Sequence, residues 1–392
     1  MPFDNNFQHQ KYSCESPLAP YRVVKPESVF DVDSTHAKQI MSQFADRLRE
    51  RSIRSVYLVH GTFAGTDVLG VIRELERWVP SMGKVLREHQ KKLVDMFAGE
   101  AGNFSQAYAE RFSEMINAKG QVELPVKLFH WTGENLHLAR ANAAVRLIDG
   151  MLSDTESQPA RYLLWGHSHA GNVFALLTNL VGGDRTCLRR FFAVGRSLLK
   201  RSASGVLDYP VWKRVRRQVL ADPSRLNRIK LDIVTFGTPI RYGWETRGYQ
   251  SLMNVIHHRS IEGVPEYLAI FPTTLTDVIQ ARSGDYVQQL GVAGTNLTPY
   301  LPAWRSWVAE RRFRSLLERG IRRRDTLDRL RIGQRVPAEG TTLLVEYPNR
   351  PKGFSEQLFG HAVYTRSDWL AFHAQQLDAF WSPPSNQADP VP

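Results

Sequence analysis

The stretch Tyr162-Leu-Leu-Trp-Gly-His-Ser-His-Ala-Gly-Asn172 combines a short apolar run, a turn of small residues and the start of an apolar helix. Tyr162–Trp165 predicts a buried strand, and Asn172–Leu180 predicts a buried helix. Ser168 lies in the turn between them. A sharp strand-to-helix turn lifts a serine hydroxyl clear of its neighbours, and small flanking residues let the backbone make that turn. The stretch therefore indicates an α/β unit with a nucleophilic serine.

The glycines of this turn depart slightly from the pattern G-x-S-x-G. Ala170 stands at the fifth position, and Gly171 follows one place later. Alanine is still small enough for a close contact between strand and helix, so the departure leaves the interpretation intact. The structural alternative is an ordinary capping serine in a turn of small residues.

Four other segments resemble buried strands and alternate with helical patterns along the chain. They are Ser55–Val59, Val126–Trp131, Leu231–Phe236 and Thr341–Tyr347. Strands that alternate with helices favour a mostly parallel sheet with helices on both faces, which is an α/β fold.

The segment His60-Gly-Thr-Phe-Ala-Gly65 directly follows the first of these strands. A tetrahedral intermediate needs backbone N–H donors directed at its oxyanion, and a glycine-rich turn at the carboxyl edge of a sheet supplies one. We expect this oxyanion hole to use the amides of Thr62 and His169, with Phe63 as the alternative to Thr62. A plain strand–loop turn is the competing interpretation.

Three segments together resemble the α/β-hydrolase lipases and esterases: His60-Gly61, Gly166–Asn172 and Thr235-Phe-Gly-Thr-Pro239. Within that superfamily the chain is most similar to bacterial lipase-like proteins related to GPI-inositol-deacylase-like lipases and to type VI secretion phospholipase effectors. The resemblance covers about residues 54–370, interrupted by two basic segments. It implies an α/β-hydrolase fold and a catalytic triad in the chain order Ser…Asp…His.

The base of such a triad lies in a loop after the last strand. His361 follows the predicted strand Thr341–Tyr347 and precedes an apolar helix over Trp369–Phe380. We therefore expect His361 to take the Ser168 proton and later to return it to the leaving alcohol. The rivals are His257 and His258, which precede any plausible acid. A capping or surface histidine is the structural alternative.

The acid is expected between Ser168 and His361. Asp285 stands in a Ser-Gly turn after a short apolar run, in a setting comparable to that of the acid in similar lipases. Its role would be to orient His361 and to stabilise the imidazolium. Asp277 and Glu262 are the alternatives, and an aspartate in such a turn also occurs without any chemistry.

The formal charge of +12 is concentrated in two segments. Residues 185–230 contain 13 Lys/Arg against two acidic residues, and residues 305–335 contain 11 Arg against four. The two excesses of 11 and 7 leave about −6 for the remainder of the chain. Such a distribution favours two surfaces that face an anionic partner.

Apolar residues recur near helical spacing among these charges, including Phe191, Phe192, Trp304, Trp307 and Phe313. Basic helices with tryptophans suit an anionic membrane surface, and in lipase-like enzymes such insertions often form a lid. The alternative is a solvated basic face that packs on the core. We expect no nucleic-acid partner, since no DNA- or RNA-binding motif is present.

These features predict three regions. A tail and packing helix occupy 1–50, a hydrolase domain occupies 51–384 with insertions at about 181–230 and 298–338, and a disordered tail occupies 385–392. No apolar signal-like or membrane-spanning run is apparent, and two distant cysteines offer no disulfide framework. We therefore expect a cytoplasmic protein, with signal-independent export left open.

The predicted activity is the hydrolysis of carboxylic esters without a metal or organic cofactor, on a lipid or phospholipid at a membrane surface. The chain has neither H-E-x-x-H nor a glycine-rich phosphate loop. The alternatives are a soluble-ester esterase, an acyltransferase or a peptidase with the same triad, and a catalytically idle scaffold that binds membrane or a partner protein.

Overall fold

The computed structural model describes residues 7, 13–28, 31–61, 103–119, 122–155, 158–195, 208–239, 241–271, 277, 280–292, 304–318, 329, 332–348 and 360–382. Thr62, Phe63 and the predicted tail 385–392 lie outside these ranges, so the predictions made for them stay predictions.

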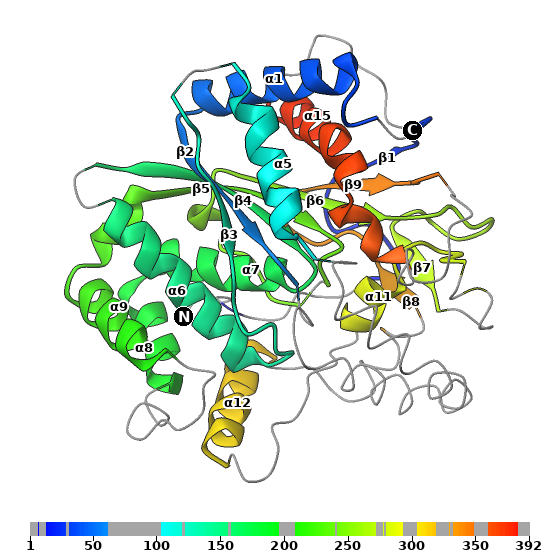
Figure 1. Ribbon diagram of the computed structural model, residues 1–392. Coiled ribbons are helices and arrows are strands. Elements are labelled where there is room, and N and C mark those ends of the chain that lie inside the picture. The colour runs from blue at the N-terminus through cyan, green and yellow to red at the C-terminus, as the bar shows by residue number, and fades with distance from the viewer. Residues whose placement is uncertain are drawn as a thin grey trace.

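A seven-stranded sheet forms the centre of the described structure, in the order β1-β9-β6-β5-β4-β2-β3 (Figure 1). Every neighbouring pair in it is parallel. The strands are β1 Tyr21–Val24, β2 Ile53–Val59, β3 Val126–Phe129, β4 Ala160–His167, β5 Ile229–Phe236, β6 Ser251–His257 and β9 Thr341–Val345. β4, which precedes Ser168, therefore has two strands on one side and four on the other.

Side chains alternate along these strands between two hydrophobic cores, one on each face of the sheet. On β4, Tyr162 and Leu164 belong to the first core, whereas Leu163 and Trp165 belong to the second. All four are fully buried. Because both faces are covered, the strand appears in the sequence as a continuous apolar run and not as an alternating one.

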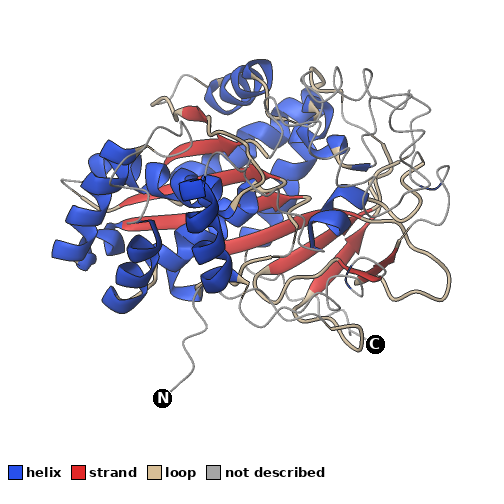
Figure 2. Cartoon of the chain, turned by 90° about the horizontal axis from the view of Figure 1, so that it is seen from below, coloured by secondary structure: helices blue, strands red, loops and turns tan. Residues whose placement is uncertain are grey.

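Helices cover both faces of the sheet, as predicted (Figures 1 and 2). The second core contains residues of α1 Thr35–Glu50, α5 Gln106–Asn117 and α15 Leu370–Trp381. The first core contains residues of α6 His137–Asp154, α7 Ala170–Val181, α8 Arg185–Gly195, α9 Tyr209–Ala221 and α12 Trp304–Leu317. The chain thus has an α/β architecture with a parallel sheet.

The sequence analysis did not identify two strands of this sheet. β6 lies between β5 and β9 but contains Asn254 and His257, which interrupt its apolar pattern. The amide oxygen of Asn254 accepts from Thr235 Oγ1 on β5 at 2.8 Å, so a sheet neighbour satisfies this polar group. β1 is a four-residue edge strand within the predicted tail, paired with β9.

The remaining elements are small. β7 Leu268–Ile270 and β8 Ile332–Gln334 form a two-stranded antiparallel sheet, and α11 Tyr286–Val292 is a short helix. The 3-10 helices are Pro223–Arg228, Thr246–Gly248, Ala362–Thr365 and Ser367–Trp369. Of the helices in the described ranges, none combines the length and apolar composition needed to cross a bilayer.

Candidate active site

Ser168 occupies the turn between β4 and α7, at the carboxyl edge of the sheet. β4 ends at His167 and α7 begins at Ala170, so two residues make the connection. Ser168 has a φ of +56°, in the left-handed region that residues with a side chain rarely adopt. Such strain persists only where the surroundings enforce it, and it is characteristic of functional turns.

The end of β5 holds this turn in place. The Ser168 amide donates to the Phe236 carbonyl at 2.7 Å, and Thr238 Oγ1 donates to the Ser168 carbonyl at 2.8 Å. Gly61, at the end of β2, approaches from the other side: a Cβ atom there would lie 2.6 Å from Ser168 Cβ. The glycine after β2 thus leaves room for the serine side chain.

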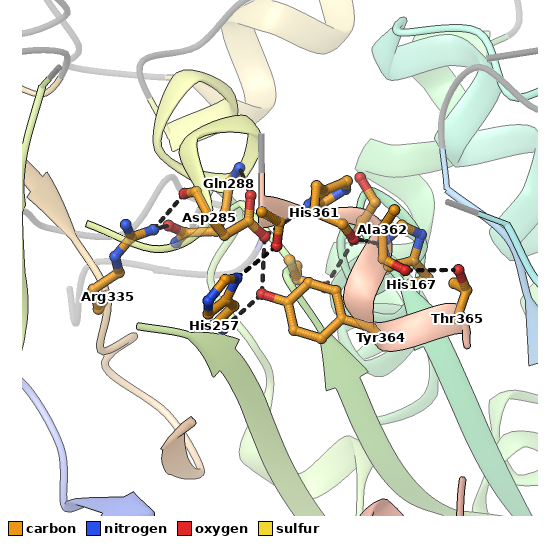
Figure 3. A network of polar contacts seen from close by, with 12 residues as sticks. His167, His257, Asp285, Gln288, Arg335, His361, Ala362, Tyr364 and Thr365 are labelled. Atoms are coloured by element: carbon orange, nitrogen blue, oxygen red, sulfur yellow. Dashed lines mark hydrogen bonds and ion pairs between the residues drawn. The ribbon is translucent and has the colours of Figure 1, made fainter. Parts of the chain in front are cut away.

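His361 and Asp285 are brought into direct contact. His361 Nδ1 lies 2.7 Å from Asp285 Oδ2, and both side chains are buried (Figure 3). The two residues are 76 positions apart in the chain. Because the carboxylate accepts from Nδ1–H, the imidazole presents Nε2 as its other nitrogen.

The backbone of Asp285 is attached to the end of β6. Its amide donates to the His257 carbonyl at 3.0 Å, and the preceding Gly284 forms a bridge with His258. The side chain also accepts from the Gln288 amide at 2.9 Å. Burial by itself raises the pKa of Asp285, but the nearby His361 and the Gln288 amide, together with Arg335, hold it below its usual value.

Two residues that the sequence analysis did not single out also contact the aspartate. Tyr364 donates its hydroxyl proton to Asp285 Oδ2 at 2.9 Å. The buried guanidinium of Arg335 donates to the Asp285 carbonyl at 2.6 Å and to the Ser283 carbonyl at 2.9 Å. No sequence motif marks either residue, because their roles depend only on tertiary contacts.

The Asp285–His361 pair lies beside the Ser168 turn. The imidazole rings of His167 and His361 have centroids 4.4 Å apart, and His167 Nε2 donates to the His361 carbonyl at 3.2 Å. Within the described residues, Ser168 Oγ makes no hydrogen bond to His361. Catalytic hydrogen bonds are often long without substrate and tighten in the complex, so this geometry is compatible with a serine–histidine pair.

The alternative bases and acids occupy different settings. His257 Nδ1 donates to the Gly360 carbonyl at 2.8 Å, and burial lowers its pKa to about 3. His258 contacts Glu266. Asp277 pairs with Arg282 at 3.0 Å, and Glu262 is exposed. None of these contacts joins a histidine to Asp277 or to Glu262.

His169 follows Ser168 immediately and stands at the N-terminal end of α7. Amides in this position are not used by the helix itself, so its N–H is a suitable donor for an oxyanion. The side chain of His169 is buried, with Nδ1 3.1 Å from Asn172 Nδ2. Burial, followed by the charges of Arg140 and Arg241, holds its pKa well below the ordinary value, so the ring is neutral.

A buried group of charged residues joins α12 to α6 near His169. Both oxygens of Glu310 accept from the first two amides of α6, at 2.9 and 3.0 Å. Glu318 forms an ion pair with the buried Arg241 and lies 3.3 Å from His137 Nε2. Leu136 at the N-cap of α6 has no side-chain cap, so a residue from a helix far along the chain completes this helix end.

The apolar sides of the basic helices pack inside the protein. Phe191 of α8, Trp212 of α9 and Phe313 of α12 are fully buried and in ring contact with one another. Phe191, Phe192 and Phe313 are therefore core residues, as the packing alternative predicted. Arg311 and Arg312 remain exposed, and Trp307 is 39% exposed. The hypothesis that the basic helices bind a membrane surface thus depends on their exposed arginines and on Trp307.

One cluster among the described residues has the composition of a metal site. His258, Glu266 and Glu346 bring their ligand atoms within 4.8 Å of one another. However, Glu346 pairs with Lys25 at 3.0 Å, and the Ser260 hydroxyl contacts both carboxylates. Since these contacts satisfy both carboxylates, we assign no metal to the cluster.

Comparisons of the chain with family models, with curated proteins and with solved structures found no match. The functional interpretation therefore depends on the geometry of the site and on the sequence resemblance stated above.

Proposed function

We propose that the chain is a serine hydrolase of the α/β-hydrolase type that cleaves carboxylic esters. In this proposal Ser168 is the nucleophile, His361 the base and Asp285 the acid. The observation that carries it is the 2.7 Å contact between His361 and Asp285 beside the strained turn of Ser168. The three residues occur in the chain order Ser…Asp…His, and the ring of His361 lies beside that of His167, the residue before Ser168.

The proposed reaction has two halves. As Ser168 Oγ attacks the ester carbonyl carbon, His361 Nε2 takes the hydroxyl proton and passes it to the departing alkoxide, which leaves as an alcohol. A water molecule then gives a proton to His361 and attacks the acyl-enzyme. The carboxylic acid leaves, and Ser168 recovers its proton. Asp285 holds the imidazole in the required tautomer throughout.

The negative charge on the tetrahedral intermediate needs backbone N–H donors at the carboxyl edge of the sheet. The His169 amide is one proposed donor, and that of Thr62 is the other. The neutral His169 ring contributes no charge of its own, and the buried Arg140 and Arg241 lie close enough to lower its pKa.

We propose a lipid or phospholipid as the substrate class. The exposed arginines of α8 and α12 support this, because cationic side chains attract anionic headgroups. The triad by itself is equally compatible with a soluble ester, with acyl transfer or with peptide cleavage, and a panel of esters from short acyl chains to intact phospholipids distinguishes these substrates.

A fluorophosphonate probe tests whether the site is catalytic or an idle scaffold. Ser168 Oγ would displace fluoride from phosphorus and form a stable adduct, while its proton passes to His361. We expect wild type and Ser55→Ala to be labelled, since Ser55 is an equally buried serine on the neighbouring strand β2. Ser168→Ala should remain unlabelled. Labelling of Ser168→Ala equal to wild type, or no labelling of folded wild type, contradicts the proposal.

A further inference from the structure

Tyr364 has a fully buried side chain whose hydroxyl makes two hydrogen bonds of fixed direction (Figure 3). It accepts from the His257 amide at 2.6 Å, since an amide N–H can only donate. It donates to Asp285 Oδ2 at 2.9 Å, since this carboxylate accepts. The hydroxyl thus links the end of β6 to the aspartate side chain.

The same carboxylate oxygen also receives the His361 Nδ1–H at 2.7 Å. Two donors therefore share Oδ2, while Oδ1 receives the Gln288 amide at 2.9 Å. With Tyr364 on one lone pair of Oδ2, the other is left for His361. The carboxylate cannot rotate about its Cβ–Cγ bond without losing several of these contacts.

The tyrosine remains a donor over the working pH range. Burial, and secondly the charge of Asp285, hold the pKa of Tyr364 well above its ordinary value. Near neutral pH the hydroxyl is therefore protonated while Asp285 is ionised, and it stabilises the carboxylate charge.

We propose that Tyr364 is a positioning residue for catalysis, whose hydroxyl fixes the orientation of Asp285 Oδ2. The same hydroxyl weakens the attraction of the carboxylate for a positive charge on His361. This inference rests on the proposed function. Tyr364 itself touches neither the nucleophile nor the substrate; it acts through the aspartate.

The expected consequence is a change in pH dependence. Without the Tyr364 hydroxyl, Asp285 loses one donor and attracts a positive charge on His361 more strongly. His361 is then available as a base only at higher pH, so the acid limb of the rate profile moves upward. The other charged or titratable neighbours of the pair stay in place: Arg335, His167, and the neutral His169 and His257.

The test compares Tyr364→Phe with Tyr347→Phe. Tyr347 is a buried tyrosine of the same core, but its hydroxyl contacts His373 Nε2 at 2.7 Å and not Asp285. The readout is the rate of Ser168 labelling by a fluorophosphonate from acid to alkaline pH. For Tyr364→Phe we expect a maximal rate lower by about tenfold or more, unchanged probe affinity and an acid limb at higher pH. Tyr347→Phe should match the wild-type profile.

A second variant preserves the size and the two hydrogen bonds of the side chain. Difluorotyrosine at position 364 is a stronger donor, so it should move the acid limb to lower pH, opposite to Tyr364→Phe. If neither variant moves the acid limb while wild type is labelled, the positioning role is wrong and the proposed function stands. If wild type itself is not labelled at Ser168, both are wrong.

Discussion

Replacing Asp285 by asparagine tests the central contact of the site, because the structure determines how the amide would lie. Asp285 Oδ1 accepts from the Gln288 amide at 2.9 Å, whereas Oδ2 accepts from His361 at 2.7 Å and from the Tyr364 hydroxyl at 2.9 Å. If the new NH2 group faced Gln288, two donors would oppose each other at hydrogen-bond distance. The Gln288 amide can only donate, whereas the Tyr364 hydroxyl can turn its proton away and His361 can change its tautomer. The favoured arrangement therefore keeps the oxygen at Oδ1 and places the NH2 group against His361 and the Tyr364 oxygen.

In that arrangement the asparagine donates to His361 Nδ1, and the imidazole proton moves to Nε2. A protonated Nε2 cannot accept the proton of Ser168, so general-base catalysis is lost while the shape of the site is kept. We expect the rate to fall by about three to four orders of magnitude. At about 1.36 kcal/mol for each tenfold change, this corresponds to roughly 4 to 5.5 kcal/mol of lost transition-state stabilisation.

The assay is the hydrolysis of a short chromogenic ester by purified, folded protein, with Asp277→Asn as the matched control. Asp277 is a buried aspartate of the same region that pairs with Arg282. Asp285→Asn should lose activity, and Asp277→Asn should stay within a few-fold of wild type. The reasoning is refuted if Asp285→Asn is nearly as active as wild type, or if Asp277→Asn is the crippled variant.

Three further predictions follow from the site and its surroundings. His361→Ala should lower ester hydrolysis as much as removal of the nucleophile, and the double variant should be no worse, because triad members act as a unit; additive losses would contradict this. Glu318→Gln should lower the free energy of unfolding by about 3 kcal/mol in denaturant titrations, because it breaks a buried ion pair. Glu50→Gln removes the acid of an exposed ion pair and should lower the free energy of unfolding by less than about 1 kcal/mol. Equal losses for Glu318→Gln and Glu50→Gln would contradict this prediction. Replacing Arg311 and Arg312 with Gln should weaken co-sedimentation with anionic vesicles at low salt and leave short-ester hydrolysis unchanged. If the double variant sediments with the vesicles as wild type does, α12 packs against the core without binding the membrane.

The sequence predicted the buried strands β2, β4, β5 and β9, because each of them contains a continuous apolar run, and it also predicted the half-buried β3. The strand expected over Tyr162–Trp165 extends over Ala160–His167, and that expected over Val126–Trp131 ends at Phe129. β6 was missed because Asn254 is satisfied by Thr235 on the neighbouring strand, a contact that no local pattern reveals. The edge strand β1 was missed because four residues carry too little periodicity.

For the candidate site, Asp285 and His361 were selected from their local context and from the chain order that the resemblance to lipases implies, and the structure places them 2.7 Å apart. Tyr364 and Arg335 could not be selected, since their contacts with the aspartate span 79 and 50 residues. The aromatic residues of the basic segments were ambiguous, because an amphipathic helix has the same pattern whether its apolar side meets a membrane or a protein core.

The pairing of β1 with β9 has a consequence for how the chain folds during synthesis. β1 is made early, but its partner spans Thr341–Val345, about 320 residues later. β6, next to β9 on the other side, must also wait for it. Until the ribosome has passed Val345, a nascent chain holds β6 as an unpaired edge with an apolar surface, which is prone to associate with other chains. We therefore expect translation stalled before that point to yield a product that depends on chaperones, and this part of the sheet to be among the last to form.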